Sequence, residues 1–287
     1  MSTDLTEREN TILGSSAAFI IGVTLQPTVY SKNARQQGLP LTLDPRLLYR
    51  GIGPSLANEM GQLGLQCAAT GALKKALPST TVGEFSAALG AGALVALFAS
   101  PCELLMIQQQ RQGTSMLETP LKILRTHGVG TLLGRGLGMC AARDAIYVGG
   151  MLGFTPICYD WLLKAQSPSS ATDGGRPAVS AGAEAIASMG SSMIGGTICA
   201  VISHPFDVVK TCMQGDLERK TYAGSMQTAL ALVSDGGLAR LMSGVFWRSV
   251  NIVASVYIAN VCCRLLPPYV KTLTRGSPDA EIGGKKA

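Results

Sequence analysis

Charged residues are scarce in this chain of 287 residues, and so are aromatic residues. Lysine, arginine, aspartate and glutamate make up 15% of the sequence and aromatic residues 5%, while 47% is hydrophobic. An ordinary soluble domain carries about 25% charged residues. Disordered chains are less hydrophobic than this one, and nucleic-acid-binding chains carry dense basic runs, which are missing here. The composition excludes both classes and favours an integral membrane protein.

Motifs of catalysis and of metal binding are also missing. The eight cysteines are scattered without a Cys-x-x-Cys pair or a metal-ligand spacing, and the sequence has only two histidines. It contains no nucleophile–base constellation, phosphate-binding loop or dinucleotide fingerprint. The sequence predicts a protein that is not an enzyme and needs no metal or cofactor. The first ten residues are polar and acidic, unlike a signal or transit peptide, so any targeting information is expected to be internal.

Three stretches carry no charged residue at all. They cover residues 10–31, 85–102 and 185–206. A bilayer core of about 30 Å is crossed by about 20 predominantly apolar helical residues. Each stretch is therefore predicted to span a membrane.

These three stretches belong to an internal repeat. Each contains a proline near its end (Pro27, Pro101 or Pro205), and a glutamine follows each proline at the same offset (Gln36, Gln110, Gln214). Small residues stand thirteen and nine positions before each proline, a spacing of four that lets membrane helices approach closely. The pairs are Gly14 and Ala18, Ala88 and Gly92, and Ser192 and Gly196. Agreement at all these offsets in three copies predicts a threefold repeat.

Each repeat continues through a glycine-containing turn into a second apolar stretch. We therefore predict an all-α membrane protein with six transmembrane helices, in three pseudo-symmetric two-helix repeats around a central cavity. The first helices of the repeats are expected at 10–36, 83–110 and 182–213, and the second at 53–77, 139–165 and 245–266. The expected divisions are 1–81 (repeat 1), 82–166 (repeat 2), 167–179 (linker), 180–271 (repeat 3) and 272–287 (polar tail).

Short surface helices are expected between the two helices of each repeat. The clearest is predicted at Met226–Val233. The first connection, between Pro27 and Gly51, is too short for a normal helix of this kind.

The repeat resembles that of the mitochondrial carrier family, whose signature P-x-[DE]-x-x-[KR] closes the odd-numbered helices. The third copy, HPFDVVKTCMQ at residues 204–214, matches completely, and the Tyr222-Ala-Gly224 segment is similar to a family lipid-binding element. The resemblance covers residues 10–270 and marks this chain as a divergent member. It implies a multi-pass protein of the mitochondrial inner membrane, with cardiolipin as a bound lipid.

The resemblance also implies a gate on the matrix side of the cavity. A proline inside a helix bends it, so that three equivalent bends converge. The acid of one repeat pairs in the family with the base of the next, which predicts Glu103–Lys210 and Asp207–Lys32. The third pair is replaced by Val29 and Met106, both apolar. Loss of both partners is consistent with a working two-pair gate; the alternative is a gate that has degenerated.

The sequence matches only part of the family's pattern for the gate on the opposite side of the cavity. Tyr159 and Asp160 on the fourth helix fit its aromatic–acid pattern, and Lys74 on the second helix is a candidate base. This departure weighs against an ordinary two-gate cycle.

The resemblance places substrate contacts about two turns past each connecting glycine. That offset falls on Asn58 and Glu59, on Arg143 and Asp144, and on Asn251. Charged residues at membrane depth indicate function by default, and in the family an Arg-Asp pair accompanies amino-acid-like substrates. The alternative is that Arg143, Asp144 and Glu59 satisfy one another without a ligand. With Arg143 as a substrate contact, Arg143→Ala is expected to abolish uptake and leave thermal stability nearly unchanged.

Two functions from different classes remain open. One is a transporter of a small metabolite, amino-acid-like or another small zwitterion or anion, by alternating access. The other is a non-transporting carrier-fold subunit, structural or regulatory, of a larger inner-membrane complex. The charged cluster favours the first, whereas the short first connection and the weak opposite gate favour the second.

Overall fold

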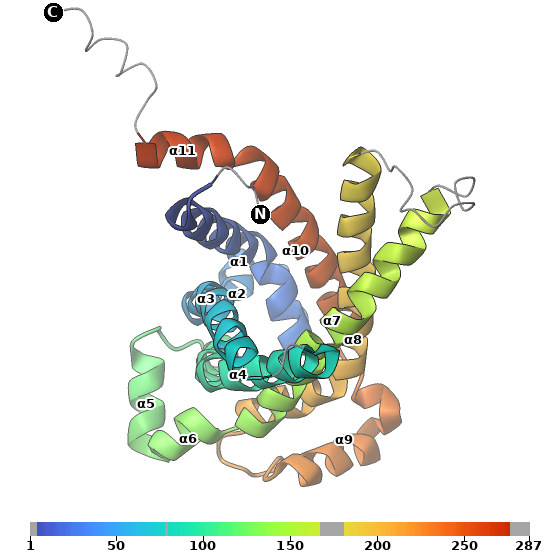
Figure 1. Ribbon diagram of the computed structural model, residues 1–287. Coiled ribbons are helices and arrows are strands. Elements are labelled where there is room, and N and C mark those ends of the chain that lie inside the picture. Colours follow the sequence, from blue (N-terminus) through green and yellow to red (C-terminus); the bar gives the residue numbers. More distant parts are fainter. Residues whose placement is uncertain (1–4, 78–79, 167–180, 276–287) are drawn as a thin grey trace, which may run out of the picture.

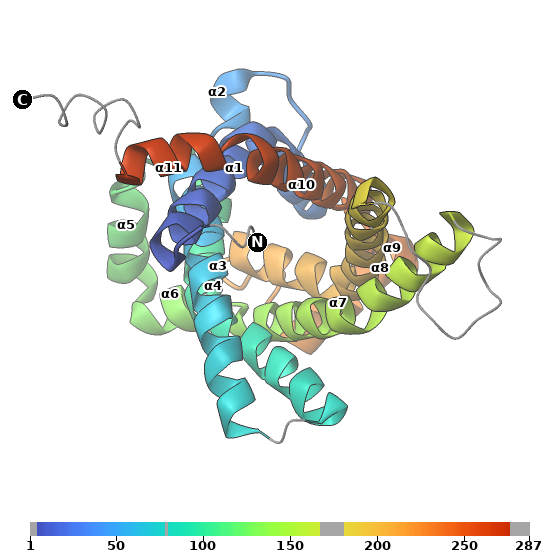
Figure 2. The ribbon, with the colours of Figure 1, turned by 45° about the horizontal axis from the view of Figure 1, so that its top comes forward.

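Six long helices form a ring in a computed structural model that describes residues 5–77, 80–166 and 181–275. The six are α1 (Glu7–Gln37), α3 (Ile52–Ala76), α4 (Thr81–Gln112), α7 (Leu137–Gln166), α8 (Ala181–Gly215) and α10 (Val245–Leu265). Each packs against the next along the chain, and α10 packs against α1 and closes the ring. The view of Figure 2 shows these helices surrounding a central opening. All six predicted helices are present, with ends within a few residues of the predicted ones.

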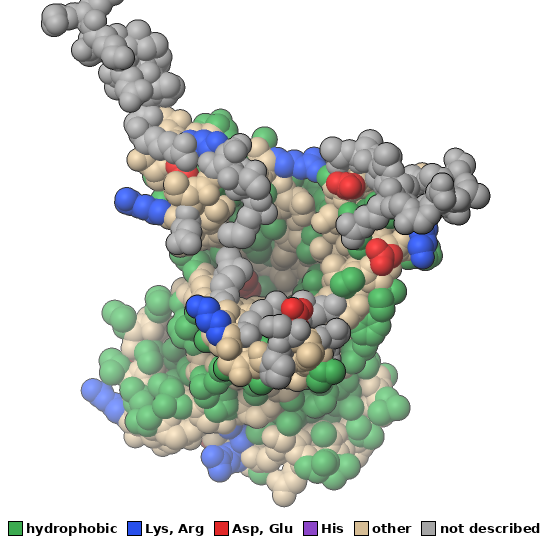
Figure 3. Space-filling model, in the orientation of Figure 1, with side chains coloured by type: hydrophobic (Ala, Val, Ile, Leu, Met, Phe, Trp, Pro, Cys, Tyr) green, Lys and Arg blue, Asp and Glu red, His purple; other side chains and the backbone are tan. Residues whose placement is uncertain are grey.

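The ring has the length and composition of a membrane protein. Four of its helices, α1, α4, α8 and α10, are long and apolar enough to cross a bilayer. Even α10, with 21 residues, reaches about 30 Å at the helical rise of 1.5 Å per residue. The remaining two, α3 and α7, also have the length to cross a bilayer, and they carry charged residues that line the central cavity: Glu59 on α3, and Arg143 and Asp144 on α7. Hydrophobic side chains cover much of the outer surface in Figure 3.

Four shorter helices connect the long ones. They are α2 (Pro45–Leu48), α5 (Glu118–His127), α6 (Val129–Gly134) and α9 (Ser225–Arg240). As the sequence predicts, the first connection is reduced: α2 has only four residues, and α9 contains the predicted surface helix. Figure 1 shows α5, α6 and α9 gathered at one end of the ring, which we call the connector end.

The carboxyl-terminal boundary predicted at residue 272 falls inside a helix. Helix α11 (Pro267–Arg275) runs through that position and packs its Val270 against Leu5 and Leu13 beside the start of α1. These apolar contacts with α1 hold α11 in place after the last membrane-spanning helix, α10. The predicted linker at 167–179 and the rest of the predicted tail lie outside the described residues.

One glycine per repeat allows the second helix of that repeat to contact a neighbouring first helix. Gly51, Gly136 and Gly244 all have φ near +80°, a region that favours glycine. A Cβ atom on Gly51 would lie 2.9 Å from the carbonyl oxygen of Met106, and one on Gly244 would lie 3.0 Å from that of Lys32. The same atom on Gly136 would lie 3.1 Å from Lys210. The three glycines thus contact the three equivalent positions of the repeat motif, so the sequence repeat is also a repeat of tertiary contacts.

At the connector end, Arg135 fastens the end of α8 to the loop that follows it. Its guanidinium donates to the carbonyl oxygens of Met213 and Ala223 at 2.9 and 2.7 Å, and also to those of Asp216 and Tyr222. The Asp216 carboxylate accepts from the backbone N–H groups of Thr221 and Tyr222 at 2.7 and 2.8 Å. The loop thereby follows α8 in one fixed path.

This loop is expected to loosen in acid. Burial raises the pKa of Asp216, but hydrogen bonds from the backbone of Tyr222, Thr221 and Lys220 outweigh it and hold that pKa below its ordinary value. A lowered pKa stabilises the loop above the ordinary aspartate value of about 3.9, and the stabilisation is lost as pH falls through the lowered value. Hydrogen exchange at the Thr221 and Tyr222 amides should therefore accelerate below about pH 4 beyond its intrinsic pH dependence. Asp216→Asn should remove the pH-dependent part; acceleration that persists in this variant would contradict the assignment.

Candidate functional site

The predicted site residues meet in one cavity inside the ring. The cavity has a volume of about 190 Å³, and its wall includes the residues predicted to contact substrate and three of those predicted to form the gate. Figure 3 shows the molecule hollowed between its helices. From the first set the cavity is lined by Asn58, Glu59, Arg143, Asp144 and Asn251, and from the second by Lys32, Glu103 and Asp207. All five predicted contact residues therefore share one space with the charged motif residues.

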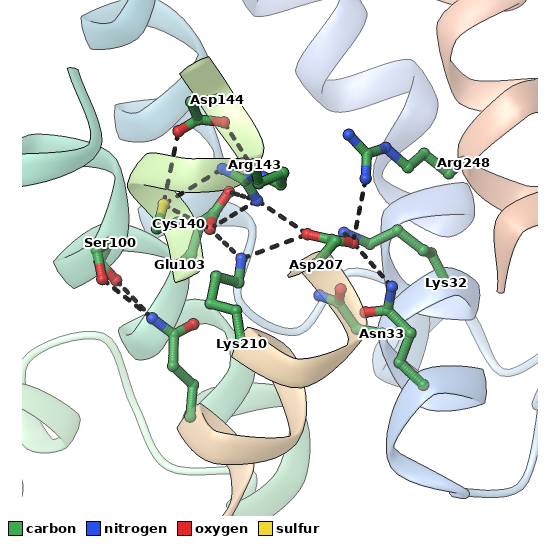
Figure 4. Close-up of polar contacts among 12 residues, drawn as sticks. Lys32, Asn33, Ser100, Glu103, Cys140, Arg143, Asp144, Asp207, Lys210 and Arg248 are labelled. Atoms are coloured by element: carbon green, nitrogen blue, oxygen red, sulfur yellow. Dashed lines mark hydrogen bonds and ion pairs between the residues drawn. The ribbon is translucent and has the colours of Figure 1, made fainter. Parts of the chain in front are cut away.

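Ion pairs join α8 to both α1 and α4, next to the connector end. Lys32 Nζ lies 2.9 Å from Asp207 Oδ2, and Lys210 pairs with the Glu103 carboxylate. Asp207 and Lys210 are almost completely buried, with 1% of each side chain exposed. These are the two pairs that the repeat register predicts, and Figure 4 shows them side by side. Buried charges need such partners, because desolvation of an unpaired charge is costly.

Arg143 joins these two pairs to each other. Its Nη1 donates to both oxygens of Glu103, at 3.0 and 3.1 Å, and to Asp207 Oδ1 at 2.9 Å. Its Nε donates to Asp144 Oδ1 at 2.8 Å, and its Nη2 lies 3.4 Å from Cys140 Sγ. All three guanidinium nitrogens are therefore engaged. The sequence places Arg143 at the substrate, whereas in the structure it binds the acids of the predicted gate.

The three repeat glutamines have three different sets of partners. Gln36 Nε2 donates to Asp207 Oδ2 at 2.7 Å and so supports the Lys32–Asp207 pair. Gln110 accepts from Asn33 at 2.9 Å. Gln214 donates to the backbone of Ser100 and Arg135, both at 3.1 Å, and so ties α8 to α4 and to the start of α7. Only the first of the three contacts one of the two predicted ion pairs directly.

The side of the ring between α1 and α4 has no ion pair at the motif positions. Val29 and Met106 stand where the repeat would place an acid and a base, and both line the cavity. One helical turn further along, the neutral Asn33–Gln110 hydrogen bond joins the same two helices. The two charged links of the motif therefore both start from α8.

Glu59 differs from the other acids of the cavity. Its side chain is exposed to the cavity, and among the described residues no hydrogen bond or ion pair engages its carboxylate. The prediction that Arg143, Asp144 and Glu59 satisfy one another is thus met only for Arg143 and Asp144. Asn251 donates to Thr28 Oγ1 at 2.8 Å, and Asn58 accepts from Gln62 at 3.2 Å.

Arg248 is a cavity residue that the list of predicted contacts leaves out. It lies on α10 one turn after Gly244, with Nη1 3.9 Å from Asp207 Oδ2 and Nη2 2.9 Å from Ser203 Oγ. Its guanidinium also stands over the ring of Tyr147 at 6.0 Å. The signal in the sequence is an arginine in the first turn of an apolar helix whose one other charged residue, Arg264, lies at the opposite end. Glu59 and Arg248 give the cavity one acid without a described partner and one cation whose nearest paired acid, Asp207, lies 3.9 Å away.

The opposite gate expected from the family resemblance stays a prediction. Asp160 on α7 is exposed, and Tyr159 beside it is partly exposed. Lys74 belongs to α3, but its side chain lies outside the described residues. The ion pairs of the cavity therefore lie at the connector end.

Comparison with known proteins agrees with this architecture. Residues 182–266 match the family model described as mitochondrial carrier protein. A curated relative named mitochondrial uncoupling protein 6, from Arabidopsis thaliana, is 24% identical over 220 residues, and the alignment covers 71% of this chain and 61% of that protein. The chain is thus similar to the mitochondrial carrier family, most directly in its third repeat, and the repeat and the ring of six helices agree with that similarity.

Proposed function

We propose that the protein is a transporter of the mitochondrial inner membrane that moves a small metabolite by alternating access. The observation that carries this proposal is the pair of ion pairs beside the cavity, Lys32–Asp207 and Glu103–Lys210, which lie where α1, α4 and α8 meet. Contacts of this kind hold one conformation and are released when a ligand binds the other more tightly. Similarity to the carrier family supports the same function.

The charges of the cavity favour a small zwitterion, such as an amino acid, or a small anion. An ammonium group can approach Glu59, whose carboxylate has no described partner, and a carboxylate can approach Arg248. Asn58 and Asn251 add amide groups that can orient the ligand. Di- and tricarboxylates need several free cations, and Arg143, Lys32 and Lys210 are already paired with acids.

Cardiolipin is the lipid that we propose at the connector end. The amino termini of α9 and α10 begin at Gly224 and Gly244 without a side-chain cap, so their N–H groups are available to phosphate. An apolar cavity between α7, α8 and α9 lies beside them and can receive an acyl chain; it is lined by residues such as Met139, Phe206 and Met226.

The second candidate is a non-transporting subunit of a larger inner-membrane complex. The four-residue α2 favours it, because this connection is shorter than those of the other two repeats. The two functions are distinguished by transport itself.

The test is uptake into liposomes by the purified protein, with a panel of amino acids, keto acids, nucleotides and cofactors. We expect uptake of a small zwitterion or anion, reduced at least tenfold by Glu59→Gln and unchanged by Glu218→Gln, which makes the same change on an exposed loop. The first substitution should leave thermal stability intact, because no described partner is lost. Folded protein that takes up no member of the panel would contradict transport. Uptake that survives Glu59→Gln would contradict the zwitterion site alone.

A further inference from the structure

The sequence motif supplies two of the three ion pairs expected at the gate. The structure nevertheless connects all three helices, α1, α4 and α8, through charged side chains. Lys32–Asp207 links α1 to α8, and Glu103–Lys210 links α4 to α8. Between α1 and α4, Val29 and Met106 offer no charge. With two links alone, α4 and α1 would be joined only by neutral contacts such as the Asn33–Gln110 hydrogen bond.

Arg143 supplies a charged route between these two helices. Starting from α4, the route runs from Glu103 to Arg143 at 3.0 Å, then to Asp207 at 2.9 Å and to Lys32 on α1 at 2.9 Å. Only 7% of the Arg143 side chain is exposed, so water screens these contacts little. Figure 4 shows the guanidinium between the two carboxylates.

The local packing explains how an arginine from α7 reaches this place. A Cβ atom on Gly92 of α4 would lie 2.7 Å from the carbonyl oxygen of Asp144, so α7 approaches α4 closely only because this residue is a glycine. Cys140, one turn before Asp144, is fully buried and small. Its Sγ lies 3.4 Å from Arg143 Nη2, so this side chain leaves room for the guanidinium beside Glu103.

The charge balance of the cluster points in the same direction. Three acids (Glu103, Asp144, Asp207) face three bases (Lys32, Arg143, Lys210) within ion-pair distance, and Arg248 adds a fourth base at 3.9 Å. Arg143 pairs with all three acids, and it is the one described base within ion-pair distance of Asp144. The three carboxylates of the cluster are therefore joined through Arg143.

We propose that Arg143 takes the place of the missing third ion pair and holds α4 to α1 through Asp207 when the gate is closed. The proposal rests on the proposed function in treating the cluster as a gate. Arg143 is then a positioning residue of the closed conformation, and Val29 and Met106 are tolerated because the route through Asp207 replaces their link.

The test restores the missing pair directly. In full-length protein in detergent, Arg143→Gln should lower the Tm markedly. Adding Val29→Asp together with Met106→Lys should recover at least half of that loss, because it links α1 to α4 without Arg143. Neither single substitution should recover it, and neither should the neutral pair Val29→Asn with Met106→Gln. A general packing role for Arg143 would give no rescue by charges placed on two other helices.

Failure of rescue by the charged pair, or equal rescue by the neutral pair, would overturn the proposal. If the Arg143→Gln protein does not fold, recovery of folded protein on adding the charged pair supports the proposal, and continued failure to fold overturns it. The Tm is measured without any substrate. A wild-type protein that transports nothing would thus contradict the proposed function and still leave the role of Arg143 decided.

Discussion

Asp207→Asn is expected to destabilise the protein by about 3–5 kcal/mol, the cost typical of removing one partner from a buried ion pair. The Asp207 carboxylate accepts from Lys32, Gln36 and Arg143 at 2.7 to 2.9 Å, and its side chain is 1% exposed. Asparagine has almost the same volume, so the loss measures charge rather than packing. A domain is stable by only about 5–15 kcal/mol, so the expected loss is a large share.

Asp144→Asn is the matched control for this prediction. It makes the same chemical change in the same cluster, but Asp144 is 16% exposed and pairs with Arg143 alone among the bases. Thermal unfolding of the two purified variants in detergent should show a clearly larger fall in Tm for Asp207→Asn. Equal falls would mean that the cations around Asp207 do not depend on its charge.

The helices and the two ion pairs were within reach of the sequence because a repeat fixes relative positions. Prolines, glycines and charge-free runs at constant offsets locate the six helices. The pairing rule implied by the resemblance to the mitochondrial carrier family then pairs Glu103 with Lys210 and Asp207 with Lys32, and the structure brings both pairs together. The repeat supplies the equivalent positions, and the resemblance supplies the pairing.

The sequence could not predict the direction in which a long side chain extends. The offset from Gly136 places Arg143 on the cavity side of α7, but its guanidinium can extend either toward the open space or toward the gate. The choice depends on contacts from other helices, namely Glu103 on α4 and Asp207 on α8. The expectation that Arg143→Ala leaves stability nearly unchanged is therefore replaced by an expected large loss. Arg248 was not among the predicted substrate contacts for a related reason. Its contact with Asp207 joins α10 to α8, and the sequence of α10 alone does not show it.

The double charge reversal Glu103→Lys with Lys210→Glu is expected to fail to restore function. From the repeat alone, the two reversals should compensate, because an isolated pair is indifferent to which partner carries which sign. In the structure the pair is not isolated. Arg143 Nη1 lies 3.0 Å from Glu103, and Asp207 Oδ1 lies 3.6 Å from Lys210 Nζ.

After the double reversal, a lysine at position 103 would face Arg143 and a glutamate at position 210 would face Asp207. Each new like-charge contact is buried, where water screens it little and the repulsion is strong. Both the Tm and the uptake of the double variant should therefore stay as low as those of the worse single reversal. The conservative pair Glu103→Asp with Lys210→Arg keeps every sign in place and should retain most of both.

Recovery by the double reversal would show that the Glu103–Lys210 pair acts independently of its neighbours. That result would contradict the strong coupling of the cluster through Arg143, because residues in one ion-pair network show non-additive effects on mutation. The comparison of the reversed with the conservative pair separates the two cases, since both change the same two positions. A gate in which one arginine serves two acids tolerates changes of side-chain length better than changes of sign.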